Sequence, residues 1–499
     1  MRHPALRTFI VTGVALFMVA LDNLIVTNAL PSIRTDLGTG LEGLGWTVNA
    51  YTLTFAVLLL PASAVAERYG RRRLFTAGLA LFTLASAAAA LAPGIGVLIA
   101  ARAVQGVGGA VVTPLTLTLL AGAVPPAKRG VAIAAWSVMS GLGVALGPVV
   151  GGAVTQYTSW QWIFWLNVPI GVVLVALAPR FLTESRGTAK RLDILGTLLV
   201  TGGLLGIVLG LVRGNEHGWT SGQVLGSLAG GAVLLVAFVA HELRTTRPML
   251  PMRLFRSRGF SLVNVISLLM TFAMFGSTFL LIQFLQGSQQ MTPLEAGIRT
   301  LPWTGMPILV GPLTAPLITR FGGRAVLAAA LLLQTVGLGW MLVVLAPATT
   351  YAAFVPGFVL AGIGMGLFFA PVARMTLGFA PPELTGVASG VGNMLRQLGT
   401  VLGVAVLGAV FAGNGDLGDP GAFVDGLRPA MGLGVAVLAA GVVAAAFIPK
   451  GLPSEQAGAA KSDGAAKADG AAKADGAAEG GGAAEAGPRP AEAARTSAS

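Results

Sequence analysis

The chain has 499 residues, of which 55% are hydrophobic and only 10% carry a charge. Soluble domains carry about 25% charged residues, so lipid rather than water must surround most of this chain. The absence of cysteine excludes disulfide scaffolds, thiol nucleophiles and Cys-based metal sites, and His3, His217 and His241 lie too far apart to give a metal-ligand spacing. A net charge of +12 would suit a nucleic acid partner. Whether it indicates one depends on where along the chain the basic residues lie.

Hydrophobic runs follow one another along most of the chain. A membrane-spanning helix needs roughly 20 predominantly apolar residues. Marking such runs between charged or turn-rich breaks gives fourteen, and the weakest breaks lie at 93–96 and 347–351. Merging across both would leave twelve spans, but each merged run would be far longer than one bilayer crossing, so we predict fourteen. Their expected limits are 9–30, 46–66, 74–92, 97–123, 131–155, 162–180, 194–212, 223–241, 260–285, 298–319, 325–346, 351–376, 385–412 and 430–448.

Lysine and arginine are distributed unevenly between the two sides that these spans would separate. If the N-terminus is cytoplasmic, the loops on the opposite side hold only Arg34, Arg213, Arg299 and Arg428. Cytoplasmic loops carry the excess of basic residues, so we predict a cell-membrane protein with both termini in the cytoplasm. The first hydrophobic run is too long for a signal peptide and contains Asp22, which indicates a permanent span. The basic surplus then sets orientation and attracts anionic lipids, and we expect no nucleic acid partner.

Residues 451–499 differ in composition from the rest of the chain. A hexad of Ala, Lys, Asp and Gly recurs through Lys461, Lys467 and Lys473, with almost no large apolar side chains. Such a segment cannot bury a core, so we predict a disordered cytoplasmic tail. A simple solvated extension and a regulatory or partner-binding tail are the two interpretations of it.

Three ionisable residues stand well inside predicted spans. They are Asp22 in the first, Arg102 in the fourth and Arg396 in the thirteenth. A charged side chain in mid-bilayer costs about 2.5–3.5 kcal/mol on insertion scales, so a chain that keeps one there usually turns it toward a cavity or a partner. These residues are therefore the leading functional candidates.

Asp22 has the chemistry of a proton-coupling residue. Desolvation favours the protonated carboxyl and a nearby cation favours the carboxylate, so a site that alternates between wet and closed states can load and release a proton. Arg102 would bias that equilibrium, and Gln105 shares its helix face. The structural alternative is that Asp22 pairs with an arginine or the backbone only to hold helices together. Arg396 has Asn393 and Gln397 nearby, and either a substrate cavity or helix pairing would explain this group. If it is a substrate cavity, we expect Gln105 to line it as well.

The fifth span carries glycines at a four-residue spacing. Gly143, Gly147 and Gly151 would form a groove that lets another helix approach closely, and Gly152 follows directly. Pro148 removes one backbone hydrogen bond and permits a bend. Close packing alone explains the glycines, and the proline adds a candidate hinge.

Two similar cytoplasmic loops suggest an internal repeat. The loop between spans two and three contains Glu67, Arg68, Gly70, Arg71 and Arg72, and a weakened version of it follows span ten at 319–324. Gly70 permits a tight turn, and Glu67 is placed to pair with arginines at a helix end. Internal duplication is common in secondary transporters. We therefore predict an all-α membrane protein with two pseudo-symmetric six-helix bundles at 1–193 and 260–450, joined by two inserted helices and a linker at 194–259 and followed by the tail at 451–499.

Several of these motifs together resemble the major facilitator superfamily. The loop 63–73 is similar to its signature loop, with Ser63 in place of a glycine and Glu67 in place of an aspartate. Further segments resemble motifs of its fourteen-span drug:proton antiporter subfamily: Leu21–Asp22 with Asn28–Pro31, Arg102 with Gln105–Gly106, Gly143 to Gly152, Trp160–Gly171, and Leu395–Gly399.

The resemblance implies alternating access and proton-driven export of drugs or other amphipathic, often cationic, small molecules. It implies proton coupling through Asp22 and Arg102, gating by the loop 67–72 and an antiporter motif at 143–152. A dedicated exporter of one self-made secondary metabolite and an uncoupled facilitator or importer are the alternatives. We expect a bacterial monomer that is driven by the proton gradient and needs no cofactor. No Cys nucleophile, His cluster or nucleotide-binding phosphate loop indicates an enzyme or an ATP-driven pump.

Overall fold

The computed structural model describes residues 3–125, 128–186, 193–246 and 248–449, and these ranges contain helices and no β-strand. A helix satisfies its own backbone hydrogen bonds, which a segment surrounded by lipid must do. Fourteen helical segments in the described ranges are long and apolar enough to cross a membrane. The prediction of fourteen spans is confirmed, and both uncharged breaks do separate helices. The predicted tail lies outside the described residues.

Between His3 and Phe181 the described residues form seven α-helices, which we call the N-terminal bundle. Together α6 and α7 make one span, interrupted at Leu166. The bounds are α1 (His3–Leu37), α2 (Leu41–Tyr69), α3 (Arg71–Ala90), α4 (Ile95–Ala123), α5 (Arg129–Tyr157), α6 (Trp162–Trp165) and α7 (Asn167–Phe181).

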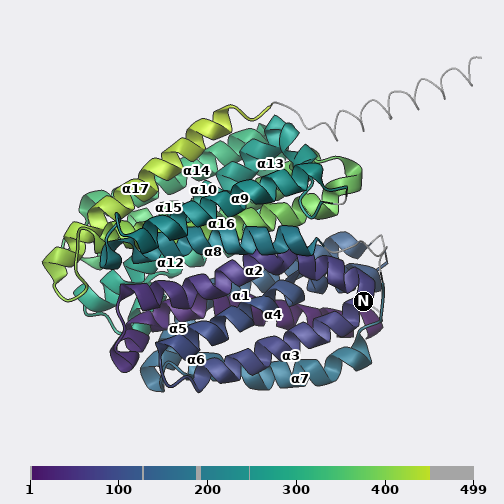
Figure 1. Ribbon diagram of the computed structural model, residues 1–499, viewed down its shortest axis with the longest axis horizontal. Coiled ribbons are helices and arrows are strands. Elements are labelled where there is room, and N and C mark those ends of the chain that lie inside the picture. The colour runs from purple at the N-terminus through teal and green to yellow at the C-terminus, as the bar shows by residue number, and fades with distance from the viewer. Residues whose placement is uncertain (1–2, 126–127, 187–192, 247, 450–499) are drawn as a thin grey trace, which may run out of the picture. The chain divides into compact units, whose positions relative to one another are not determined.

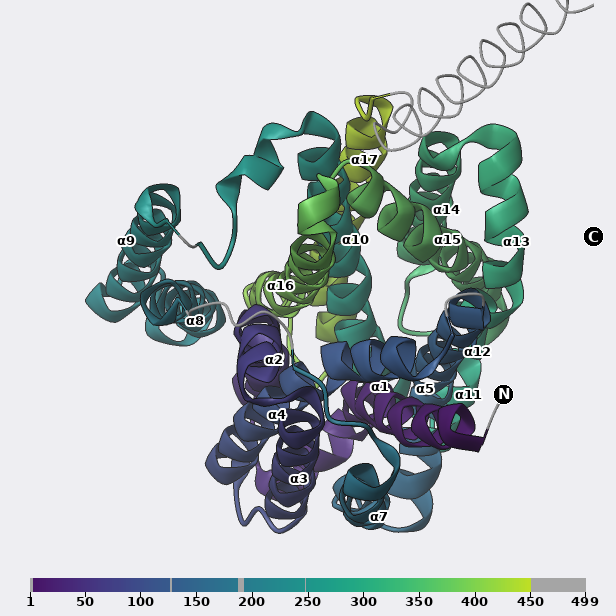
Figure 2. The same cartoon turned by 90° about the vertical axis from the view of Figure 1, so that its right-hand side faces the viewer.

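The described residues from 193 onward form an inserted helix pair and a C-terminal bundle. The pair is α8 (Ile194–His217) and α9 (Gly222–Arg244), which pack on each other, and α8 also contacts α2 and α16. Figure 2 shows this pair beside α2 and α16. The C-terminal bundle comprises η2 (Met252–Arg256), α10 (Arg258–Gln283), η3 (Phe284–Ser288), α11 (Pro293–Arg299), α12 (Leu301–Thr304), α13 (Met306–Phe321), α14 (Gly323–Val344), α15 (Tyr351–Gly378), η4 (Pro382–Leu384), α16 (Thr385–Ala412) and α17 (Pro420–Ala446).

Corresponding helices of the two bundles pack alike. In the N-terminal bundle α3 contacts α4 and α7, and in the C-terminal bundle α14 contacts α15 and α17 (Figure 1). The turn before α3 has Gly70 at φ 112°, and the turn before α14 has Gly322 at φ 82°. Positive φ favours glycine because it has no Cβ. The same left-handed turn thus occurs at both loops in which the sequence repeat was recognised.

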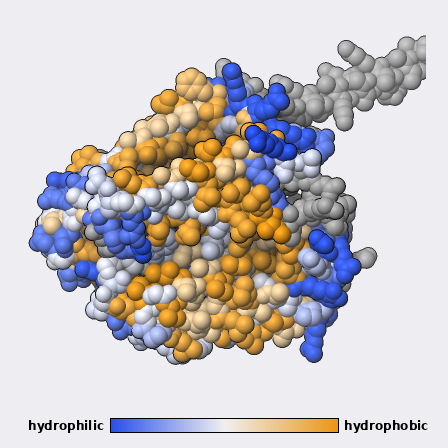
Figure 3. Space-filling view, viewed as in Figure 1, coloured by the Kyte–Doolittle hydropathy of each residue, from blue (hydrophilic) through white to orange (hydrophobic). Residues whose placement is uncertain are grey.

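The surface has the polarity that a bilayer requires. On the face shown in Figure 3, apolar side chains cover the middle, and hydrophilic ones gather toward the two ends. Large apolar side chains such as Leu84, Val236 and Val343 are exposed on the helices. In water such exposure would be unfavourable, whereas lipid tails contact these side chains at no cost.

Candidate functional site

Asp22 lies in α1 at the centre of a buried polar network in the N-terminal bundle. Its carboxylate is fully buried, and its Oδ2 lies 2.6 Å from Nη1 of Arg102 in α4. Its Oδ1 accepts hydrogen bonds of 2.8 Å from Nε2 of Gln105 and from Nδ2 of Asn167 at the start of α7. Both carboxylate oxygens therefore have donors, all of which come from other helices.

Arg102 is as well enclosed as its partner. Only 1% of the residue is exposed, and its guanidinium donates to the Thr47 carbonyl and to Oε1 of Gln105. Its Cζ atom lies 4.3 Å from the centre of the Tyr51 ring, so the cation also faces an aromatic π-system. Gln105 donates in turn to the hydroxyl of Ser86 in α3. One network therefore joins α1, α2, α3, α4 and α7.

The sequence correctly singled out three members of this network and missed others. The structure brings Asp22, Arg102 and Gln105 together, so Gln105 belongs to this site and not to the group around Arg396. Asn167 and Ser86 were not predicted as members. The one available signal for Asn167 was an amide inside a hydrophobic run, in the quoted segment 160–171.

The glycines of α5 form the predicted groove, and its occupant is α1. A Cβ atom on Gly143 would lie 2.8 Å from Cβ of Ala20, and one on Gly147 would lie 2.8 Å from Cβ of Leu24. A Cβ on Gly151 would lie 2.6 Å from the carbonyl oxygen of Ile25. The helix that carries Asp22 is therefore packed directly against the antiporter-like motif.

The end of that motif reaches the other bundle. The carbonyl of Pro148 accepts a hydrogen bond from Nδ2 of Asn28, which also donates to the carbonyl of Pro293 at 3.3 Å. Gly152 packs against the backbone of Pro293, and Gly297 of α11 packs against the Pro148 carbonyl. Through these contacts α1 and α5 pack against α11. The residues involved lie in the C-terminal half of α1 and in the C-terminal half of α5.

The basic loop after α2 is organised by a carboxylate that the sequence did not reveal. Glu67 lies 3.9 Å from Arg71, one turn away in sequence, which is a weak ion pair. Glu184, beyond the end of α7, accepts hydrogen bonds from the backbone amides of Arg72 and Arg73 and lies within 4 Å of both guanidinium groups. Orphan amides at a helix start bind a carboxylate favourably. Glu184 was missed because it lies more than a hundred residues from the loop.

Arg396, Asn393 and Gln397 lie in α16 of the C-terminal bundle. Arg396 donates to Oδ1 of Asn393, and both residues line a cavity between α15 and α16. Gln397 is not among the residues that line it. The predicted substrate group is thus divided, because Gln105 belongs to the Asp22 network.

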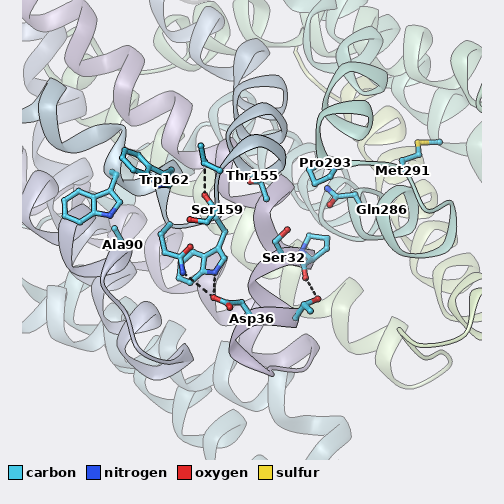
Figure 4. Close-up of a pocket in the computed structure, with 15 residues that line it drawn as sticks. Ser32, Asp36, Ala90, Thr155, Ser159, Trp162, Gln286, Met291 and Pro293 are labelled. Atoms are coloured by element: carbon cyan, nitrogen blue, oxygen red, sulfur yellow. Dashed lines mark hydrogen bonds between the residues drawn. The ribbon is translucent and has the colours of Figure 1, made fainter.

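A larger cavity of about 1000 Å³ opens near the contacts of α1 and α5 with α11 (Figure 4). Its wall includes Asp36 at the end of α1, whose carboxylate accepts hydrogen bonds from the Trp160 indole at 2.7 Å and from the Gln161 amide at 3.3 Å. Trp162 and Gln286 also line this cavity. In the described ranges, no group of three or more His, Cys, Asp or Glu side chains could hold a metal ion.

Comparison with known proteins agrees with this architecture. The family model of the Major Facilitator Superfamily matches residues 12–404. The multidrug resistance protein Stp of Mycobacterium tuberculosis is 36% identical over 83% of this chain and 77% of its own length. The tetracenomycin C resistance and export protein of Streptomyces glaucescens is 35% identical over 81% of this chain and 76% of its own length. The puromycin resistance protein pur8 of Streptomyces alboniger is 37% identical, covering 80% of each chain.

Solved transporters share the fold at low identity. An auto-inhibited POT family peptide transporter matches with a TM-score of 0.67 and 14% identity, over 90% of this chain and 98% of its own. The xylose transporter XylE from E. coli matches with a TM-score of 0.60 and 13% identity, over 89% and 98%. The members of this family are transporters and not enzymes. The chain belongs to the major facilitator superfamily.

Proposed function

We propose that this protein is a proton-coupled exporter in which Asp22 carries the coupling proton. The observation that supports the proposal is the fully buried Asp22–Arg102 pair inside two membrane-spanning helices. A carboxylate within a bilayer is costly and is commonly part of a proton pathway. Arg102, Gln105 and Asn167 all donate to Asp22, which is the arrangement that accommodates a carboxylate.

Protonation of Asp22 would change the contacts of α1. A neutral carboxyl group attracts Arg102 less strongly, so α1 and α4 would lose much of what holds them together. Asn28 lies in the same helix as Asp22, about 9 Å farther along its axis at 1.5 Å per residue. Because Asn28 also contacts α5 and α11, a shift of α1 would reach the contacts between the bundles. This connection supports an alternating-access mechanism in which α5, with its glycine groove and its proline, acts as the hinge.

The exported compounds are proposed to be drugs or other amphipathic small molecules. This part rests on the relatives, whose names describe multidrug resistance, tetracenomycin C export and puromycin resistance. The relative from Streptomyces glaucescens is named for a single compound, tetracenomycin C. A dedicated exporter of one metabolite is therefore the second candidate. We propose a monomer in the bacterial plasma membrane, with its termini in the cytoplasm and protons and the substrate as its ligands.

The substitution Asp22→Asn tests the coupling role. A compound to which expression confers resistance is first identified in a susceptibility panel, and its uptake into inside-out vesicles is then measured with an imposed pH gradient. The variant leaves Arg102 buried without its counter-ion, so it should melt at a lower temperature than the wild type but still cooperatively. At matched protein level it should show no gradient-driven uptake. Full uptake by Asp22→Asn would remove this residue from the coupling role and leave it as a helix-pairing group.

A further inference from the structure

Arg396 lies in a membrane-spanning helix, and its side chain has no acidic partner among the described residues. It lies about 16 Å from the start of α16, at 1.5 Å per residue, and is only partly exposed. Among the described residues, no Asp or Glu oxygen lies within the 4.0 Å of an ion pair. Its guanidinium donates to Asn393 and lies 5.6 Å from the centre of the Phe369 ring. A guanidinium has five N–H donors, so most of its hydrogen-bonding capacity is unused.

A small cavity lies directly against this guanidinium. Its volume is about 70 Å³, against roughly 300–1,000 Å³ for sites that enclose a drug-sized ligand. Such a space accommodates a carboxylate or another small oxyanion but not a drug-sized molecule. The cavity therefore suits one charged end of a larger compound.

The other polar groups of the cavity include a second free donor. Thr376 of α15 is 4% exposed, lines the cavity, and has a hydroxyl without any hydrogen-bond partner in the structure. Buried hydroxyl groups are nearly always hydrogen-bonded, so an orphaned one requires an explanation. Ser389 adds another hydroxyl to the wall. A cation with free N–H groups and an orphan hydroxyl, both on the wall of one cavity, can together bind an anionic oxygen.

The helix that carries Arg396 lies at the interface between the two bundles. α16 packs against α2 of the N-terminal bundle, and a Cβ atom on Gly390 would meet the side chain of Leu60. Figure 2 shows α16 beside α2. Substrate sites of secondary transporters lie at the interface between their two halves.

We propose that the Arg396 cavity binds the acidic group, a carboxylate or a comparable oxyanion, of the exported compound. Arg396 would form a paired, charge-assisted contact with two oxygens, and the Thr376 hydroxyl would donate to one of them. This inference rests on the proposed export function. It narrows the proposed substrates from amphipathic compounds in general to those that carry an acidic group. The aromatic or aliphatic body of the compound would extend out of the cavity toward the interface of the bundles.

The test compares an aromatic acid with its neutral isostere. Purified full-length protein in detergent is titrated with 1-naphthoate and with 1-naphthamide, and binding is followed by calorimetry. The acid should bind at least about tenfold more tightly than the amide, since hydrogen bonds to charged groups are worth about one factor of ten or more. Arg396→Gln should abolish this preference, and Arg396→Lys should restore part of it.

A second variant protects the test against misfolding. Thr376→Val keeps the shape and the arginine but removes the hydroxyl, so it should weaken naphthoate binding by about tenfold and leave naphthamide binding unchanged. Equal affinity of the wild type for acid and amide would overturn the proposal, and so would an unchanged preference in folded Arg396→Gln. If Arg396→Gln does not fold, an unchanged preference in Thr376→Val overturns it instead.

The outcome separates this inference from the proposed function. If naphthoate binds through Arg396 but no compound is exported in response to a pH gradient, the export function fails and the acid site stands. If gradient-driven export is observed but the acid binds no better than the amide, the substrate class fails and the function stands.

Discussion

The two bundles hold their intramembrane arginines in opposite ways. In the N-terminal bundle Arg102 is 1% exposed and lies 2.6 Å from the carboxylate of Asp22. In the C-terminal bundle Arg396 is half-buried, and none of the described acidic groups reaches it. A charge that the protein itself compensates holds helices together and can be switched by a proton, whereas an uncompensated one is available to a ligand. For this reason we propose coupling for the arginine of one bundle and recognition for the arginine of the other.

The largest effect is expected from breaking the compensated pair. Arg102→Ala leaves the Asp22 charge buried without its cation, which costs about 3–5 kcal/mol of stability when one partner of a buried pair is removed. Thermal unfolding of the purified protein measures the loss. The double variant Asp22→Asn with Arg102→Gln removes both charges and should recover most of this stability without recovering coupling.

Arg396→Gln is the matched control in the other bundle. It breaks no ion pair, so its unfolding temperature should remain close to that of the wild type. If Arg102→Ala and Arg396→Gln were equally stable, the contrast between a paired and an unpaired arginine would be wrong.

A smaller effect is expected from filling the groove between α1 and α5. Gly151→Ala would place a methyl group 2.6 Å from the Ile25 carbonyl oxygen, so α1 must shift, at an overpacking cost of about 1–3 kcal/mol. Gly141→Ala, in the same helix, meets nothing within 4 Å and should be neutral or slightly stabilising. Transport and thermal unfolding of both variants check this. Equal behaviour of the two would show that the groove does not constrain α1.

The smallest effect concerns the inserted helix pair, outside both bundles. Asp193 caps α8 by accepting from the Gly196 amide, and its Oδ1 lies 2.9 Å from Nε2 of His241. Burial acts to raise the pKa of Asp193, but the hydrogen bonds from Gly196 and His241 outweigh it and hold this pKa below its ordinary 3.8. The lowered pKa means that ionised Asp193 stabilises the fold above about pH 3.8, and that this contribution is lost as the pH falls further.

Two substitutions separate the cap from the charge. Asp193→Ala should cost about 0.5–2 kcal/mol at neutral pH through loss of the cap. Asp193→Asn keeps a capping oxygen, so it should cost less and should flatten the acid limb of a plot of unfolding temperature against pH. An acid limb as steep in Asp193→Asn as in the wild type would assign that pH dependence to other groups.

The sequence predicted the parts of this molecule that depend on local pattern. Hydrophobic length located the fourteen spans, and four-residue glycine spacing located the groove of α5. Arg102 and Gln105 were placed on one face because they are three residues apart in a helix. In each of these cases the signal lies within one segment of the chain.

The sequence could not show which segments meet. Asn167 lies 145 positions from Asp22, and Glu184 lies 112 positions from Arg72. The sequence around an amide or a carboxylate near the end of a hydrophobic run does not indicate which distant residue it contacts. For the same reason Gln105 was grouped with Arg396, although helix packing places it beside Asp22.

The central claim is that Asp22 couples proton movement to export, and one comparison tests it most directly. Wild type and Asp22→Asn are reconstituted in parallel, and each is assayed for uptake driven by a pH gradient and for exchange of labelled against unlabelled substrate without a gradient. The variant is predicted to retain exchange and to lose gradient-driven accumulation, because only the proton step needs the carboxylate. Accumulation by Asp22→Asn at the wild-type rate would contradict the account.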